Sequence, residues 1–477
     1  MRKTLIILLS VLSACLRMSE EEQRKNLVAE PSLEPTVNQN LETPFFSQGD
    51  WPKAAWWEEF GSEELNQLIV LSLAQNPSIQ NVRFKIEQAK ERANSARSKL
   101  YPLVYFDADG NWDFVSNQGI ERAYNPAFPK FAKIIDLTLS FSYEFDFWDK
   151  YRNLFRAALS VEQSQRAELA QTELITAASL ARTYFALKTN LAKEKIYVEL
   201  YAVRKKIALL RQLLLDEAID DLRILLLSNE RVEEANQWLN SIAEEVAINR
   251  HLINILAGKG PDEPISVEAG LPDLAPTLTI PANLSIDLLV RRPDLMAQIW
   301  RVETLAHEVG AARANFFPSI NLANIVGLSS TIYHLLFSSS SFENLFIPSL
   351  SLPVYTAGDI QANLDAKRAE FQSAVFLYNE MILKSSEEVV DTLVFARTAY
   401  ANKLDQELIV KQASQRLNLT ELRLAHGLDN ALQTLEKKDE LLQKELADLD
   451  FAYSRYVAVI ALVKSVGGGY IGKMDEK

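Results

Sequence analysis

Short stretches with a two-residue hydrophobic period alternate along this chain with very long stretches of helical period. From 136 to 147 every second residue is apolar, from Leu137 through Phe141 to Phe147, and the residues between them are polar. This alternation predicts a strand with one apolar and one polar face, long enough to cross a bilayer at a tilt. A soluble sheet with one buried face would alternate too, but the aromatic residues crowded near Trp148 favour a membrane interface.

Three further runs have strand character. Residues 104–114 follow a similar alternation. A later run begins well with Ile320 and Leu322 and is interrupted by Asn324, and a fourth run approaches Pro353. A proline at that place predicts the end of a strand or an edge strand.

The stretches between these runs predict exceptionally long helices. No glycine lies between Gly119 and Gly258, and no proline follows Pro353. Without such breakers a helix can continue for many turns, and one over 150–214 would be ~100 Å long. A rod of this length favours a coiled coil or the wall of a tunnel, because compact domains do not need it. A soluble helical bundle would explain the rods but not the strands.

The chain contains two copies of one unit. An offset of 216 residues superposes Pro77 on Pro293. Without any gap, the same offset matches Glu87 with Glu303, Ala96 with Ala312, Arg97 with Arg313, Tyr101 with Phe317 and Pro102 with Pro318. In each copy a helix ends at the second proline, two strands follow, and a long helical stretch comes last. This pattern is typical of an internal tandem repeat.

These observations predict a mainly α protein with a β-barrel part. Four strands are too few to close a barrel around a lumen, and open sheet edges are not tolerated in lipid. If the strands cross a membrane, several copies of the chain must therefore each contribute four strands.

The organisation that we expect has five parts. They are a lipoprotein signal peptide at 1–14, a lipidated arm at 15–60, repeat 1 at 61–270 with strands at about 102–114 and 134–147 and helices at 149–257, repeat 2 at 271–470 with strands at about 318–328 and 346–355 and helices at 358–465, and a tail at 471–477.

The N-terminus resembles the leader of a bacterial lipoprotein. Arg2 and Lys3 precede an apolar stretch at 4–12, and Leu12-Ser13-Ala14 precedes Cys15, the only cysteine. The alternative is an ordinary signal peptide with an incidental cysteine. Residues 16–60 are polar and rich in proline, so we expect an extended, poorly ordered arm. The aromatic residues expected to dock this arm are Trp51, Trp56, Trp57 and Phe60.

Composition argues against several classes of function. The net charge of −13 disfavours binding to nucleic acid. The four histidines and five methionines are dispersed, whereas a soft-metal site needs clustered ligands. No sequence feature around the acidic residues from Asp216 to Asp221 indicates a binding pocket. We therefore expect no enzymatic activity, no metal site, and no cofactor beyond a covalent lipid at Cys15.

Five segments resemble the signature of TolC-type outer-membrane factors, in particular the lipidated OprM/CusC-like branch. They are SYEFDFW at 142–148, LLVRRPDL at 288–295, VGAARANFFPSI at 309–320, LPVYTAG at 352–358 and VGGGY at 466–470. The similarity extends from about 56 to 470. Within the first segment the chain departs from the family, since Trp148-Asp149 stands where Phe-Gly is usual.

The resemblance implies a homotrimer with a twelve-stranded barrel in the outer membrane and a helical tunnel through the periplasm of a Gram-negative-type bacterium. It also implies docking onto a periplasmic adaptor and an inner-membrane pump of RND or ABC type. The function would be passive conduction of drugs or other small exported substrates, in efflux or in type I-like secretion. The alternatives are a structural periplasmic coiled-coil lipoprotein and a duct dedicated to metal-cation export.

Five residues are expected to shape the helix–strand junctions. Pro102 and Pro318 end helices where strands begin, because a proline at the first position of a strand costs no ladder bond. Arg97 and Arg313 precede these prolines and are expected to neutralise helix C-terminal carbonyls or pair with an acid. Gly358 permits a sharp bend from strand to helix.

The two turns between long helices are expected to form the periplasmic gate. In the family, acidic residues after the glycine of the second turn help to close the tunnel, and Asp429 matches that position after Gly427. The first turn lacks the usual glycine and carries Asp216, Glu217, Asp220 and Asp221. Three converging copies would repel unless a cation, a proton or a basic partner intervenes. The alternative is a solvated turn in which Asp429 caps a helix.

The polar faces of the strands predict an acidic lumen. The acids on these faces are Asp107, Asp109, Asp113, Asp136, Glu144 and Asp146. Three copies would favour passage of cations. The alternative is that some of these acids pair with loop lysines such as Lys130 or Lys133.

The lipobox-like tetrad yields a first prediction. Cys15→Ser should abolish labelling of the protein by a clickable fatty acid, since the thiol is the expected acceptor. Leu16 follows the cysteine instead of an aspartate, so we expect sorting to the outer membrane. Undiminished labelling of the variant would refute lipidation at this residue.

Overall fold

The computed structural model describes residues 31–281, 284 and 290–472, so Cys15 and the predicted signal peptide lie outside the described residues. The chain divides into two units. Unit 1 comprises Met1–Lys85, Gln165–Ala297 and Leu377–Lys477, and unit 2 comprises Ile86–Ser164 and Gln298–Phe376. The fold class is mainly helical with a four-stranded sheet, as the sequence predicts.

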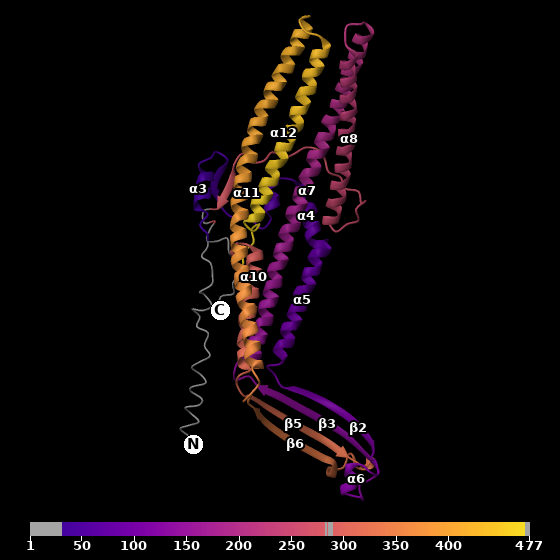
Figure 1. Cartoon of the computed structure of the whole chain (residues 1–477), viewed down its shortest axis with the longest axis vertical. Helices are drawn as coiled ribbons and strands as arrows, with labels where there is room; N and C mark the ends of the chain where they lie inside the picture. The colour runs from indigo at the N-terminus through magenta and orange to yellow at the C-terminus, as the bar shows by residue number, and fades with distance from the viewer. Residues whose placement is uncertain (1–30, 282–283, 285–289, 473–477) are drawn as a thin grey trace. The chain divides into compact units, whose positions relative to one another are not determined.

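Long helices make up most of the chain (Figure 1). Their bounds are α4 Glu63–Gln75, α5 Pro77–Ser98, α7 Lys150–Asp216, α8 Leu222–Leu256, α10 Pro293–Ala314, α11 Asp359–Ala425 and α12 Ala431–Ser465. Both α7 and α11 have 67 residues, about 100 Å at 1.5 Å per residue. Within the described residues, no helix combines the length and the apolar character needed to cross a membrane.

The internal repeat is confirmed by the element bounds. Helices α5 and α10 both have 22 residues and start 216 residues apart, because 293 − 77 = 216. The later pairs, α7 with α11 and α8 with α12, have equal lengths and an offset of 209, because 359 − 150 = 431 − 222 = 209. The offset changes in the loops that join the two strands of each copy.

Unit 2 contains one antiparallel sheet. Its strands are β2 Leu103–Phe114, β3 Phe131–Phe145, β5 Ser319–Ser330 and β6 Phe342–Ser351, in the order β2-β3-β5-β6 (Figure 1). Strand β3 starts and ends earlier than expected, which leaves Asp146 beyond its end. Strand β6 also lies earlier than expected and contains Pro348, while Pro353 follows its end. As an edge strand, β6 tolerates a proline.

The expected disorder of the arm is wrong for residues 31–60. This segment forms α3 Glu34–Leu41, β1 Phe46–Gly49 and the 3-10 helix η1 Trp56–Phe60. Strand β1 pairs in parallel with β4 Leu278–Pro281. Average polarity concealed a few well-spaced apolar side chains that are buried in unit 1. They are Leu33, Phe46, Trp56 and Phe60.

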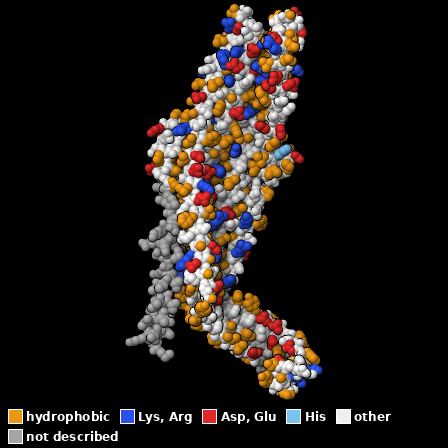
Figure 2. Space-filling view, in the orientation of Figure 1, with side chains coloured by type: hydrophobic (Ala, Val, Ile, Leu, Met, Phe, Trp, Pro, Cys, Tyr) orange, Lys and Arg blue, Asp and Glu red, His pale blue; other side chains and the backbone are white. Residues whose placement is uncertain are grey.

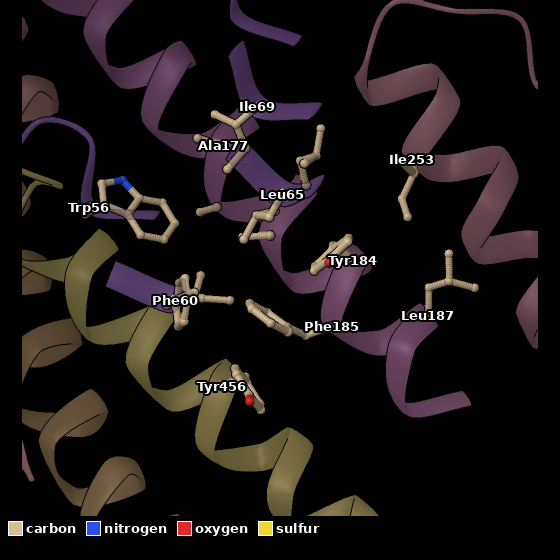
Figure 3. Close-up of a cluster of buried hydrophobic side chains, with 14 of the residues drawn as sticks. Trp56, Phe60, Leu65, Ile69, Ala177, Tyr184, Phe185, Leu187, Ile253 and Tyr456 are labelled. Atoms are coloured by element: carbon tan, nitrogen blue, oxygen red, sulfur yellow. The ribbon is translucent and has the colours of Figure 1, made fainter. Parts of the chain in front are cut away.

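Aromatic packing builds the main core of unit 1 (Figure 3). Phe185 of α7 stacks on Tyr456 of α12 with ring centroids 4.1 Å apart, and Phe60 meets the same Phe185 ring edge-on at 4.9 Å. Tyr184 is fully buried, and its hydroxyl bonds to Ser62 at 2.7 Å. This core fixes α7 and α12, whose far ends form the two turns described below.

Candidate functional site: a two-faced sheet and two acidic turns

One face of the sheet is mainly apolar on all four strands. The register places Phe106 opposite Leu139 and Leu137 opposite Leu328. On the two edge strands this face is open, since Phe106 is 67% exposed and Phe346 is 63% exposed. Figure 2 shows hydrophobic side chains spread over the sheet beside a group of acidic ones. An apolar surface of this extent is typical of a membrane or protein contact.

The opposite face carries the acids of β2 and β3. Asp107 lies across from Thr138 and accepts a hydrogen bond from Ser140 at 2.9 Å. Asp109 lies directly across from Asp136, a like-charged pair that disfavours the sheet unless a cation is near. Asp113 is on the same face and accepts a bond from Asn111.

Glu343 of β6 also lies on this acidic face and was missed by the sequence reasoning. It pairs with Gly327, which pairs in turn with Thr138, the residue opposite Asp107. The alternation in β6 was recognised only from 349 onward because Asn344 and Pro348 interrupt its apolar positions. The signal that reveals Glu343 is the strand register and not the local pattern.

The last two candidate lumen acids lie at the end of β3 and have partners. Glu144 accepts a hydrogen bond from the Tyr151 hydroxyl at 2.7 Å, and Lys150 lies 3.9 Å away. Asp146 accepts the backbone N–H groups of Tyr151 and Arg152 at 3.0 and 2.9 Å. Asp146 therefore serves the N-terminus of α7, where four N–H groups need acceptors.

Neither candidate loop lysine makes an ion pair with these acids among the described residues. Lys130 lies over the Phe114 ring at 5.1 Å. Lys133 is opposite Trp112 on the apolar face, which directs it away from the acids. The basic partner that the structure supplies near the sheet is Lys150.

The junction residues lie where helices give way to strands within unit 2. Arg97 and Arg313 are in the last turns of α5 and α10. Pro102 and Pro318 directly precede β2 and β5.

Trp148 reinforces the second junction, a contribution that the sequence did not predict. Its ring stacks on Phe317 at 4.7 Å, and its Nε1 donates to the Pro318 carbonyl at 2.7 Å.

Gly358, just before α11, has φ +89°, and Ala357 beside it also has a positive φ. The bend into α11 therefore needs backbone that glycine adopts at low cost.

The two turns between long helices have the same backbone form. In the α7–α8 turn, Ile219 N–H donates to the Leu214 carbonyl at 2.8 Å; in the α11–α12 turn, Leu428 N–H donates to Arg423 at 2.8 Å. Both bonds pass over a left-handed residue. That residue is Gly427 with φ +70° in the second turn, but Ala218 with φ +54° in the first. The first turn therefore has the same backbone geometry as the second, although it lacks a glycine.

Arginines neutralise acids of the first turn. Asp220 bonds to Arg211 at 2.9 Å, and the same guanidinium reaches Glu436 of α12 at 2.9 Å. Asp221 caps α8 by accepting the Arg223 N–H, and its carboxylate also pairs with the Arg223 side chain. These contacts hold the pKa of both aspartates below the ordinary value.

Within the part of the chain that the structure describes, the remaining two acids of this turn have no arginine contact of this kind. Asp216 accepts a hydrogen bond from Gln212, and Glu217 lies directly after the end of α7.

Asp429 of the second turn has an arginine partner and does not cap a helix. Its carboxylate accepts two hydrogen bonds from Arg423, at 2.7 and 3.2 Å, and this contact holds its pKa below the ordinary value. The cap of α12 is Asn430, which forms a capping box with Gln433. The sequence reasoning placed the acids but missed their counter-charges. For Asp429 the counter-charge is Arg423, six residues upstream in α11, a spacing that does not place two residues on one helix face, so the turn itself brings them together.

Comparison with known proteins relates this chain to outer-membrane efflux proteins. The family model described as outer membrane efflux protein matches residues 68–215 and 284–468. The chain is 25% identical to the multidrug resistance outer membrane protein MdtP of Escherichia coli K12, over 95% of this chain and 94% of the relative. It is 26% identical to the cation efflux system protein CusC of the same organism, over 88% and 90%.

Solved structures show the same fold. The outer-membrane channel OprN superposes with a TM-score of 0.81 at 21% identity, covering 93% of this chain and 97% of that one. The outer membrane protein VceC from Vibrio cholerae superposes with a TM-score of 0.77 at 26% identity, covering 88% and 100%.

The two turns predict opposite effects of exchanging alanine and glycine. Ala218→Gly should raise the free energy of unfolding by about 0.5–1 kcal/mol, because it relieves a left-handed alanine. Gly427→Ala should lower it by a similar amount, and the space around Gly427 is open, so the effect comes from the backbone alone. Thermal unfolding of the two variants measures both shifts. Shifts of the same sign would contradict the assignment of these conformations.

Proposed function

Because this chain belongs to the outer membrane efflux protein family, we propose that three copies of it form a passive exit duct for small exported substrates. The outer-membrane location and the role in efflux are those of the family. The observation that carries the proposal is the sheet of unit 2, which has an apolar face, an acidic face and two open edges.

Three is the smallest number of copies whose strands would enclose a lumen. Eight strands enclose an interior that side chains fill, whereas three copies of four strands leave room for a lumen. In such a barrel the apolar face meets lipid and the acidic face lines water. A purely structural coiled-coil lipoprotein, the first alternative, has no use for an exposed apolar sheet.

The partners that we propose are a periplasmic adaptor and an inner-membrane pump. An outer-membrane duct does no work of its own, so transport against a gradient requires an energised component elsewhere. The drug-like substrate class is supported by similarity to MdtP, which is named for multidrug resistance. Export of metal cations is the second candidate because of similar identity to CusC.

The face assignment predicts unequal effects of two adjacent substitutions on β3. Phe141→Arg should impair assembly of heat-resistant trimers, because an arginine at the lipid midplane costs ~2–4 kcal/mol. Ser140→Arg, one residue away on the acidic face, should leave assembly intact. Gel mobility of unheated membrane samples reports the outcome, and equal effects would reject the assignment.

The acidic face predicts a duct that prefers cations. In planar bilayers under a potassium chloride gradient, the reversal potential should approach that for potassium. The double variant Asp109→Asn/Asp136→Asn should move it toward zero. Asp262→Asn, at an exposed acid of unit 1, is the matched control and should not. Absence of any conductance would reject the duct, whereas anion preference would reject only the lumen assignment.

We also propose that the two turns gate the periplasmic end. Asp429 is held by Arg423 of its own chain, so three copies would bring together three neutralised pairs and not three bare carboxylates. Closing then requires less work against repulsion, and a basic partner competes with Arg423 for the same carboxylate. The first turn contributes Asp220, tied through Arg211 to Glu436 of α12.

The gate predicts a specific outcome for Asp429→Ala. Conductance should rise and block by divalent cations should weaken, because Arg423 is released and the acid is lost, while trimer stability should be unchanged. Asn430→Ala is the control, since it removes the cap of α12 and should lower stability by about 1 kcal/mol without raising conductance. Unchanged conductance in Asp429→Ala would retire the gate role of this residue.

A further inference from the structure

Unit 1 contains a small aromatic cavity that belongs neither to the sheet nor to the two turns. Its volume is about 170 Å³, and four segments of the chain line it: the arm, α4, α7 and the residues that follow α12. The aromatic part of the lining consists of Trp56 and Trp57 of η1 and of Tyr470. A cavity of this size suits one small group, because pockets for drug-sized ligands measure about 300–1,000 Å³.

A run of three glycines builds one wall of the cavity. Residues 467–469 are all glycine, and all three have a positive φ. A Cβ on Gly467 would clash with the Arg291 carbonyl oxygen, and a Cβ on Gly469 would clash with the Lys53 carbonyl oxygen. The glycines therefore allow this segment to pack tightly between two other backbones, and the ring that follows them reaches the same cavity as the two tryptophans.

The cavity has a single charged residue in its lining. Glu173 of α7 is acidic, and the other lining residues are aromatic, aliphatic or glycine. The Glu173 carboxylate lies 3.3 Å from the Arg83 guanidinium, but the two side chains are 34% and 43% exposed. An exposed ion pair of this kind contributes little stability, so another cation can displace Arg83 at small cost.

The aromatic rings of the cavity hold no cation of the chain itself. Over the described ranges, no lysine or arginine lies above the rings of Trp56, Trp57 or Tyr470, whereas Arg291 lies over Trp51 of the same arm at 4.7 Å. Aromatic faces attract cations, tryptophan most strongly, and clustered rings recognise quaternary ammonium groups. Rings combined with one carboxylate therefore match a cationic ligand and disfavour an anionic one.

The other copy of the repeat does not have this combination of side chains. The offset of 209 that relates α7 to α11 and α8 to α12 makes Ile382 the counterpart of Glu173, because 382 − 173 = 209. By the same offset, the counterpart of Tyr470 is Pro261, because 470 − 261 = 209. The architecture of the repeat therefore requires neither an acid nor an aromatic ring at these positions.

We propose that this cavity binds a small quaternary ammonium ion, with the ammonium group against the rings of Trp57 and Tyr470 and beside the Glu173 carboxylate. Trp56 has a supporting role. It is 3% exposed, belongs to the core drawn in Figure 3, and meets the Trp57 ring edge-on at 5.7 Å. The inference does not depend on the proposed duct, because every residue that lines the cavity belongs to unit 1.

Saturation-transfer NMR with choline chloride tests the site in purified full-length protein in a non-ionic detergent. The trimethylammonium protons of choline should receive saturation from the protein, and a titration gives the Kd. The matched probe is the neutral alcohol in which carbon replaces the nitrogen of choline. It has the same shape but no charge, so it should bind about tenfold more weakly. Equal binding of the two probes would overturn the assignment to a cation.

Variants separate the contribution of charge from that of packing. Glu173→Gln should weaken choline binding about tenfold, whereas Arg83→Gln should strengthen it about threefold, because the carboxylate loses its competing partner. Tyr470→Leu should weaken binding about fivefold, but Tyr470→Phe should not, since phenylalanine keeps the aromatic face. Asp262→Asn changes an exposed acid outside the cavity and should leave the Kd unchanged.

A further probe distinguishes a free ammonium ion from a lipid headgroup. Glycerophosphocholine carries the same ammonium group together with a phosphate, which the Glu173 carboxylate repels, so it should bind more weakly than choline. Tighter binding of glycerophosphocholine would overturn the assignment to a free ion. Absence of saturation transfer to choline, or equal losses of binding in Arg83→Gln and Glu173→Gln, would overturn the site itself. Unchanged thermal unfolding of each variant shows that a loss of binding is not a loss of structure.

Discussion

Unsatisfied backbone groups at two strand edges are the constraint on which the rest of this protein depends. Strands β2 and β6 end the sheet on either side, and half of their N–H and C=O groups point outward. Water could satisfy these groups at a soluble sheet, but the apolar face that all four strands share is suited to hydrocarbon, where no such partner exists. We therefore propose that the edges pair with each other across copies of the chain and that this pairing closes a duct.

The helices of unit 1 depend on a different set of interactions. Arg204 of α7 is almost fully buried and bonds to Asp439 of α12 at 2.8 Å, and Leu200 and Leu442 pack beside this pair. Removing one member of a buried pair costs about 3–5 kcal/mol, whereas an exposed pair contributes at most about 1 kcal/mol. The buried contact therefore fixes α7 against α12, and exposed pairs such as Arg423–Asp429 are weak enough to exchange partners.

The sequence predicts the long-range organisation better than the local partners. Absence of glycine and proline identified the helices, and the 216-residue offset identified the repeat whose bounds the structure reproduces. The arm at 31–60 was misjudged because a handful of anchors such as Trp56 outweigh its polar average. The strand acids could be placed by alternation, but Glu343 required the register and Asp429 required knowledge of Arg423. Side-chain pairing depends on three-dimensional proximity, which periodicity does not encode.

The most direct test of the central claim is the number of chains in the assembly. Native mass spectrometry of the complex extracted from the outer membrane counts them without any assumption about the sheet. Closure of the open edges by three copies predicts a single species with three times the mass of the mature protomer. A folded monomer, or an assembly of any other number of chains, would contradict the account.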